Sequence, residues 1–78
     1  MKAILEFNLP EDNQEFKLAS NASNWWNVCW EMDQWLRSQY KYMSDEEYSE
    51  DKYNAYVEAR EQLNILMQGS GVSLDDVQ

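Results

Sequence analysis

The sequence contains no histidine, one cysteine, one proline, two glycines and only six basic residues among its 78 positions. Without histidine, a histidine-based catalytic triad is impossible, and Cys29 has no evident base nearby to activate its thiol. The chain has no Cys/His cluster, and its acids lack the spacing and glycine of a calcium-binding loop. We therefore expect neither catalysis nor a bound metal or other cofactor.

Long apolar runs are also missing from the chain. None approaches the roughly 18 residues that a membrane span requires, and the N-terminal run MKAILEFNLPED turns acidic too early for a secretory signal. A lone cysteine between apolar neighbours fits a reducing compartment. We expect a cytoplasmic protein that makes no membrane contact.

Acidic side chains outnumber basic ones by fifteen to six, which gives a net charge of −9. Nucleic acid and anionic lipid repel such a chain, whereas basic protein surfaces attract it. We therefore expect no direct binding of nucleic acid and a protein partner that has a basic surface.

The pattern of apolar residues predicts an α-rich α+β fold in one small domain, residues 1–68, followed by a flexible acidic tail, residues 69–78. The predicted elements are a β-strand at 2–8 and helices at 10–20, 24–41 and 45–68. Residues 15–20 also alternate well enough to form a second strand instead of the end of a helix. In the helical interpretation, the first strand has no partner within the chain.

The predicted central helix contains all four tryptophans, and at 100° per residue its apolar side chains form two stripes. The broader stripe is expected to be core: Trp25, Val28, Cys29, Met32, Trp35, Leu36 and Tyr40. The second stripe combines Trp26 and Trp30 with a predicted surface ion pair, Asp33–Arg37. Either the first helix or strand covers this second stripe, or the stripe is a binding face, since Trp and Arg are enriched at interface hot spots.

The third helix is predicted to start at a capping box, Ser44-Asp45-Glu46-Glu47, and to pack antiparallel on the central helix after a short connection. Five acids cluster at this start: Asp45, Glu46, Glu47, Glu50 and Asp51. Acids in a first turn complement the helix dipole. The same carboxylates could instead face a basic groove and imitate part of a phosphate backbone locally.

Several runs resemble a set of small acidic proteins encoded by tailed bacteriophages. They are KAILEFNLPEDNQEF, WEMDQWLRSQYKY, SDEEY and a late Arg-x-x-Leu formed by Arg60 and Leu63. The resemblance spans about residues 2–67, and its most specific part is the D-Q-W-L-R run. It implies a phage origin and a host-cell cytoplasm, and it carries no mechanism with it.

These observations lead to two hypotheses of different classes. In the first, the protein binds and inhibits or redirects a host nucleic-acid-handling or defence protein, and partial DNA mimicry is one form of this hypothesis. The contact residues would be Trp26, Trp30, Asp33, Arg37, Asp45, Glu46, Glu47, Glu50 and Asp51. In the alternative, the chain is a homo-oligomeric structural or accessory module, such as a homodimer, with the strand or the Trp26/Trp30 stripe buried between copies.

Overall fold

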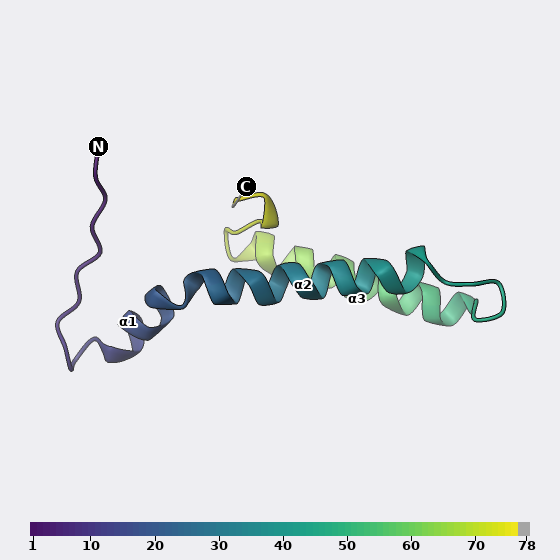
Figure 1. The fold of residues 1–78 in the computed structure, drawn as a ribbon, viewed down its shortest axis with the longest axis horizontal. Helices are drawn as coiled ribbons and strands as arrows, with labels where there is room; N and C mark the ends of the chain where they lie inside the picture. The colour runs from purple at the N-terminus through teal and green to yellow at the C-terminus, as the bar shows by residue number, and fades with distance from the viewer. Residues whose placement is uncertain (77–78) are drawn as a thin grey trace.

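The computed structural model describes residues 1–76 and consists of helices and connecting segments (Figure 1). The order of elements is α1 (Asn13–Ser20), α2 (Ala22–Lys41), α3 (Glu50–Gly69) and a short 3-10 helix η1 (Leu74–Asp76). The molecule is elongated, with extents of 56 × 28 × 19 Å. Its α-rich character agrees with the sequence prediction.

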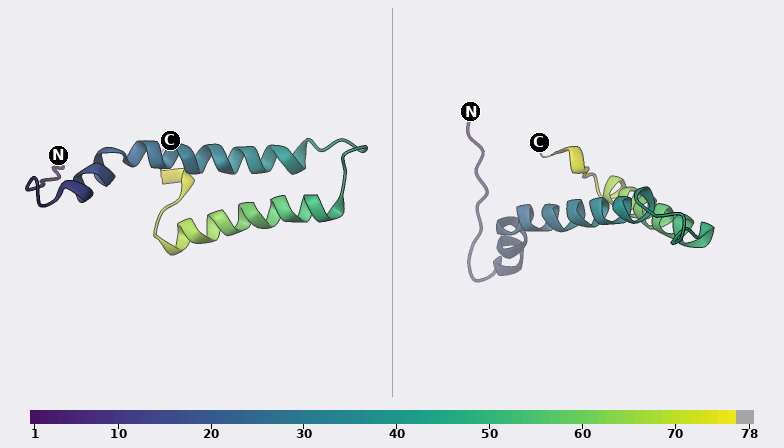
Figure 2. Two further views of the ribbon diagram at one scale, coloured as in Figure 1. Left: turned by 90° about the horizontal axis from the view of Figure 1, so that it is seen from below. Right: turned by 45° about the vertical axis from the view of Figure 1, so that its right-hand side comes forward.

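Helices α2 and α3 run antiparallel and form a helical hairpin, which is the main body of the molecule (Figure 2). Along α2, buried or half-buried residues recur at alternating spacings of three and four, and α3 shows the same rhythm. This is the 3.5-residue period of two helices that pack side by side along a narrow seam. We call these residues the inner seam: Trp26, Cys29, Asp33, Leu36 and Tyr40 on α2, and Tyr56, Arg60, Leu63 and Met67 on α3.

The start of α3 differs from the prediction, because the helix begins at Glu50 and residues 45–47 form a turn. Ser44 does accept a hydrogen bond at its side-chain oxygen from the backbone N–H of Glu47, at 3.2 Å. Ser49 then caps α3 by accepting from the backbone N–H of Lys52. Continuing one helix through both serines would stack like charges four residues apart, which disfavours the predicted start at residue 45.

The predicted strand at 2–8 is wrong for this chain, since residues 1–8 are extended but pair with no other segment among the described residues. A strand requires a second strand to bond its backbone groups, and the alternative second strand at 15–20 is helical instead. Phe7 makes an edge-on contact with Phe16 of α1 at 5.7 Å between ring centroids. The N-terminal segment is thus tied to α1 by this aromatic contact and not by a sheet.

After α3 the chain reverses direction and returns towards α2. Gly71 adopts φ 76°, a conformation that favours glycine, and the backbone N–H of Val72 donates to the Met67 carbonyl at 3.0 Å. The η1 helix then lies against α2. The predicted flexible tail therefore has a defined path as far as residue 76, and residues 77–78 of that prediction lie outside the described residues.

The apolar core within the described residues is very small, with only Leu36 and Met67 buried among the hydrophobic side chains. The predicted core stripe of α2 is wrong for most of its members: Trp25, Val28, Met32 and Trp35 are all exposed. The physical reason is that α3 packs on a face one residue further round the helix. No helix in the described part of the chain is long and apolar enough to cross a membrane.

Candidate functional site

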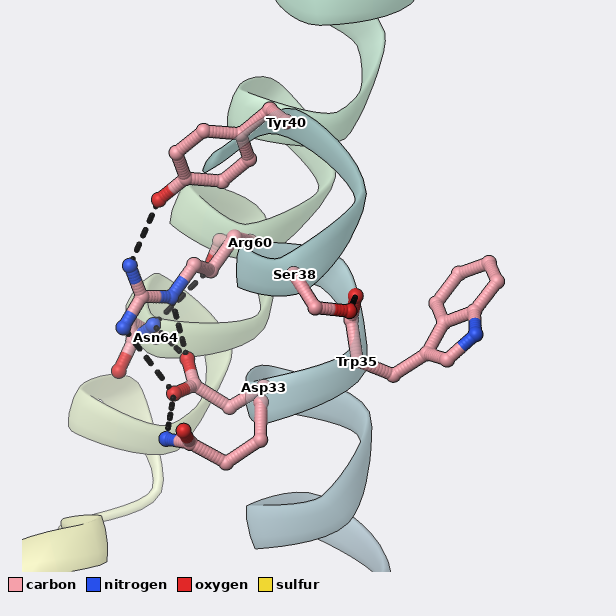
Figure 3. Close-up of polar contacts among 7 residues, drawn as sticks. Asp33, Trp35, Ser38, Tyr40, Arg60 and Asn64 are labelled. Atoms are coloured by element: carbon pink, nitrogen blue, oxygen red, sulfur yellow. Dashed lines mark hydrogen bonds and ion pairs between the residues drawn. The ribbon is translucent and has the colours of Figure 1, made fainter. Parts of the chain in front are cut away.

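A charged pair lies inside the hairpin at the middle of the inner seam (Figure 3). Asp33 of α2 is only 3% exposed, and Arg60 of α3 reaches it across the interface. The Arg60 Nε donates to Asp33 Oδ1 at 2.9 Å, and Nη2 donates to Oδ2 at 3.2 Å. This is a bidentate arrangement, which fixes the relative position of the two helices as well as their charges.

Three further polar side chains complete what we call the polar cluster. Asn64 Nδ2 donates to Asp33 Oδ1 at 3.2 Å, and Gln34 Nε2 donates to Oδ2 at 3.3 Å. Arg60 Nη1 donates to the hydroxyl of Tyr40 at 2.7 Å. The buried carboxylate therefore accepts four hydrogen bonds from protein groups, which fill its acceptor capacity.

The hydrogen bonds also set the ionisation of the pair. Burial alone would raise the pKa of Asp33, but hydrogen bonds from Arg60 and Asn64, with the charges of Arg60 and Arg37, bring it below the ordinary 3.8. The hydrogen bond to Asp33, followed by that to Tyr40, raises the pKa of Arg60 above its usual value. Both groups are thus charged at neutral pH, and a carboxylate held in this way does not serve as a proton acceptor for a substrate.

The predicted ion pair between Asp33 and Arg37 is wrong. Asp33 turns into the seam and pairs with Arg60, whereas Arg37 is exposed on α2. A carboxylate in the seam has Arg60 and Asn64 on the facing helix as donors, so Arg37 acts on it only through its charge. Asp33 is therefore a structural residue and not a surface contact residue.

Trp26 and Trp30 do stack, as their spacing predicts, with ring centroids 6.3 Å apart and planes inclined by 22°. Trp26 is half-buried and its indole Nε1 is buried without a hydrogen-bond partner among the described residues. Trp30 is 43% exposed. The Trp26 ring therefore lies at the end of the inner seam, and the Trp30 ring lies at the surface.

The five predicted acidic residues are all exposed and gather at the α2–α3 connection, the end of the hairpin farther from α1 and η1 (Figure 1). We call Asp45, Glu46, Glu47, Glu50 and Asp51 the acidic tip. Only Glu50 and Asp51 lie in the first turn of α3. The tip and the tryptophan pair lie at different positions along the hairpin, so they do not form one continuous patch.

The sequence predicts none of the polar roles of the cluster members other than Asp33, which are Gln34, Tyr40, Arg60 and Asn64. Arg60 follows Asp33 by 27 positions, so no local pattern links the two. The available signal was the seam spacing: Asp33 and Arg60 each occupy a position that the 3.5-residue rhythm turns inward.

Comparisons of the chain with protein-family models, curated proteins and solved structures find no match. Within residues 1–76, no three Cys, Asp or Glu side chains gather as a group that could hold a metal ion. The geometry of the hairpin and its surfaces is therefore the basis for assigning a function.

Proposed function

We propose that this protein acts by binding another protein through its acidic tip, and that the partner is a host nucleic-acid-handling or defence protein with a basic surface. The resemblance to small acidic phage proteins supports this setting in the host cytoplasm. The consequence of binding would be inhibition or redirection of the partner, with the tip taking the place of a short length of phosphate backbone.

One observation carries the proposal: among the described residues, none of the five tip carboxylates has a lysine or arginine within 4.0 Å. Three of them precede α3, so the helix dipole does not account for their position. Like charges held together at an exposed loop repel one another, and a basic partner relieves that repulsion. Asp33 is excluded from the partner contact by its burial, whereas Trp30 and Arg37 remain exposed as secondary contact residues.

The test is affinity capture from a bacterial host lysate, followed by titration of the captured protein. A tip variant, Asp45→Asn with Glu46→Gln, Glu47→Gln, Glu50→Gln and Asp51→Asn, removes five charges from the tip. A control variant removes five charges elsewhere: Glu6→Gln, Glu11→Gln, Glu15→Gln, Glu58→Gln and Glu61→Gln. Both variants have the same net charge, so any effect of net charge alone should change partner capture equally in the two.

We expect the tip variant to lose capture and the control to keep it. Binding by the wild type should weaken as salt rises, because exposed charges are screened over about 8–10 Å at physiological ionic strength. Competition by duplex DNA for the captured protein would support mimicry. Equal loss in both variants, or binding that salt does not change, would refute the role of the tip.

A further inference from the structure

A second stripe of large apolar residues runs along α2 beside the inner seam. Trp25, Val28, Met32 and Trp35 each precede a seam residue by one position, and one residue corresponds to a rotation of 100° about the helix axis. The stripe therefore lies beside the seam and is only partly covered: Trp25 is 58% exposed and Trp35 is 51% exposed.

Helix α3 adds apolar residues to the same side of the hairpin. The ring of Tyr56 meets that of Trp35 edge-on at 6.0 Å, and Ala59, Leu63 and Leu66 follow Tyr56 at helical spacing. In Figure 3, Trp35 projects from the side of α2 opposite the polar cluster. We name the uncharged residues of this side the apolar face: Trp25, Val28, Met32, Trp35, Ala59 and Leu66, with the half-buried seam residues Tyr56 and Leu63 at its border with the seam.

The accessible area of the chain shows how much surface is left to cover. It is 6,878 Å², whereas a compact monomer of 9.3 kDa exposes about 5,000 Å². The excess of about 1,900 Å² is shared between the extended N-terminal segment and the hairpin. A standard interface removes about 800 Å² from each partner, which is less than half of this excess.

The interior of one hairpin is correspondingly too small for a chain of this length. Leu36 and Met67 are its only buried hydrophobic side chains within residues 1–76. Domains of this size that lack disulfides or metals commonly gain the remaining apolar burial by association. Association with another molecule is one way to supply the remaining apolar burial, and the exposed stripe on α2 offers a surface for it.

The composition of the apolar face is compatible with pairing to an identical face. Its α2 half carries two tryptophans, and its α3 half carries the small Ala59 between the larger Tyr56, Leu63 and Leu66. We propose that the apolar face pairs with the same face of a second copy of this chain, α2 of one copy lying on α3 of the other. Such an isologous contact is self-complementary and closes after two copies.

The result is a four-helix bundle in which α2 touches α3 of its own chain through the seam and α3 of the second chain through the apolar face. In a square bundle the two neighbours of a helix lie roughly 90° apart, close to the 100° between the two stripes of α2. The acidic tip lies beyond the apolar face and stays exposed. This pairing is independent of partner binding by the tip.

The experiment is sedimentation equilibrium on the full chain, with thermal unfolding at several protein concentrations. We expect a species of twice 9.3 kDa and a Tm that rises with concentration, because association stabilises the folded state by mass action. Each copy carries −9, so added salt should strengthen the dimer, whereas it should weaken partner binding by the tip.

Trp35→Glu places a charge at the apolar face, and we expect the dissociation constant to rise at least about 30-fold, the loss expected of a hot-spot residue. Ile65→Glu is the matched control, since Ile65 is equally exposed but lies on α3 beside Arg60 and Asn64. It should associate as the wild type does.

A wild-type chain that sediments as a monomer at 100 µM, with a Tm independent of concentration, would overturn the proposal without any variant. If the chain is a monomer and Trp35→Glu abolishes capture of a host protein, the apolar face binds that host protein and not a second copy. A dimer that Trp35→Glu and Ile65→Glu weaken equally would also overturn it. Loss of capture by the tip variant, with the dimer intact, concerns only the proposed function.

Discussion

The α2–α3 hairpin has a polar side, where charged groups are buried and hydrogen-bonded, and an apolar side, where large side chains are exposed. On one side, Asp33 and Arg60 bring charges into the interface and satisfy them with hydrogen bonds from both helices. On the other, Trp25 and Trp35 leave most of their apolar surface uncovered. The contrast teaches that polar groups here make the contacts between the two helices, while the largest apolar groups are left exposed, which is the basis of the dimer that we propose.

The largest effect should come from breaking the polar side. Asp33→Ala leaves Arg60 as an unpaired charge in the seam, and we expect a loss of about 3–5 kcal/mol in the free energy of unfolding. Denaturation in urea measures it. Arg37→Ala removes an exposed charge from the same helix and should change stability by no more than about 0.5 kcal/mol. Equal losses in the two variants would mean that the ion pair between Asp33 and Arg60 does not contribute to the free energy of unfolding.

The next prediction compares Leu36, which lies in the inner seam, with its sequence neighbour Trp35, which lies on the apolar face. Leu36 is 7% exposed in the seam, and Leu36→Ala should cost about 2–5 kcal/mol of stability. Trp35→Ala removes a larger side chain but loses only half-buried area and the edge contact with Tyr56, about 1–2 kcal/mol. Both are measured at dilutions where the chain is monomeric. A greater loss of stability for Trp35→Ala than for Leu36→Ala would show that Trp35 is a core residue of the single chain.

The smallest expected effect is on the pH dependence of stability. The folded-state pKa of Asp33 lies below its ordinary 3.8, so the pair stabilises the fold fully above about pH 4. That contribution is lost as pH falls through the lowered pKa. The difference in unfolding free energy between wild type and Asp33→Asn should therefore be constant from neutral pH to about 4 and shrink below it. A difference that persists to pH 2 would contradict this role.

The sequence predicts the helical hairpin well, because a short connection between two periodic segments leaves little choice but antiparallel packing. It predicts the face of α2 poorly for a specific reason. Two stripes about 100° apart both repeat every three or four residues, and ranking by hydrophobicity selects the one with Trp25, Val28, Met32 and Trp35. The other contains Asp33, whose place inside becomes reasonable only with Arg60 opposite it.

The acidic tip illustrates a second limit of local patterns. Ser44 and Ser49 both precede acids and both accept a hydrogen bond from a backbone N–H three residues later. Either could begin α3, and a capping pattern alone does not rank them. Repulsion between acids along the run Glu46–Asp51 favours a helix that starts after Ser49. Asp45, Glu46 and Glu47 therefore stay in the exposed connection before α3.

The position of the Asp33–Arg60 pair has a consequence for how the chain folds. The loop that closes the hairpin is short, so contacts beside it cost the least chain entropy and those towards Trp26 and Met67 cost the most. At a separation of 27 residues, the pair forms about midway. It divides the hairpin into a half that contains the acidic tip and Trp35, and a half that contains Trp25, Trp26 and Trp30. We therefore expect local opening from the ends of the hairpin to expose the backbone near Trp26 more often than the backbone on the tip side of the Asp33–Arg60 pair.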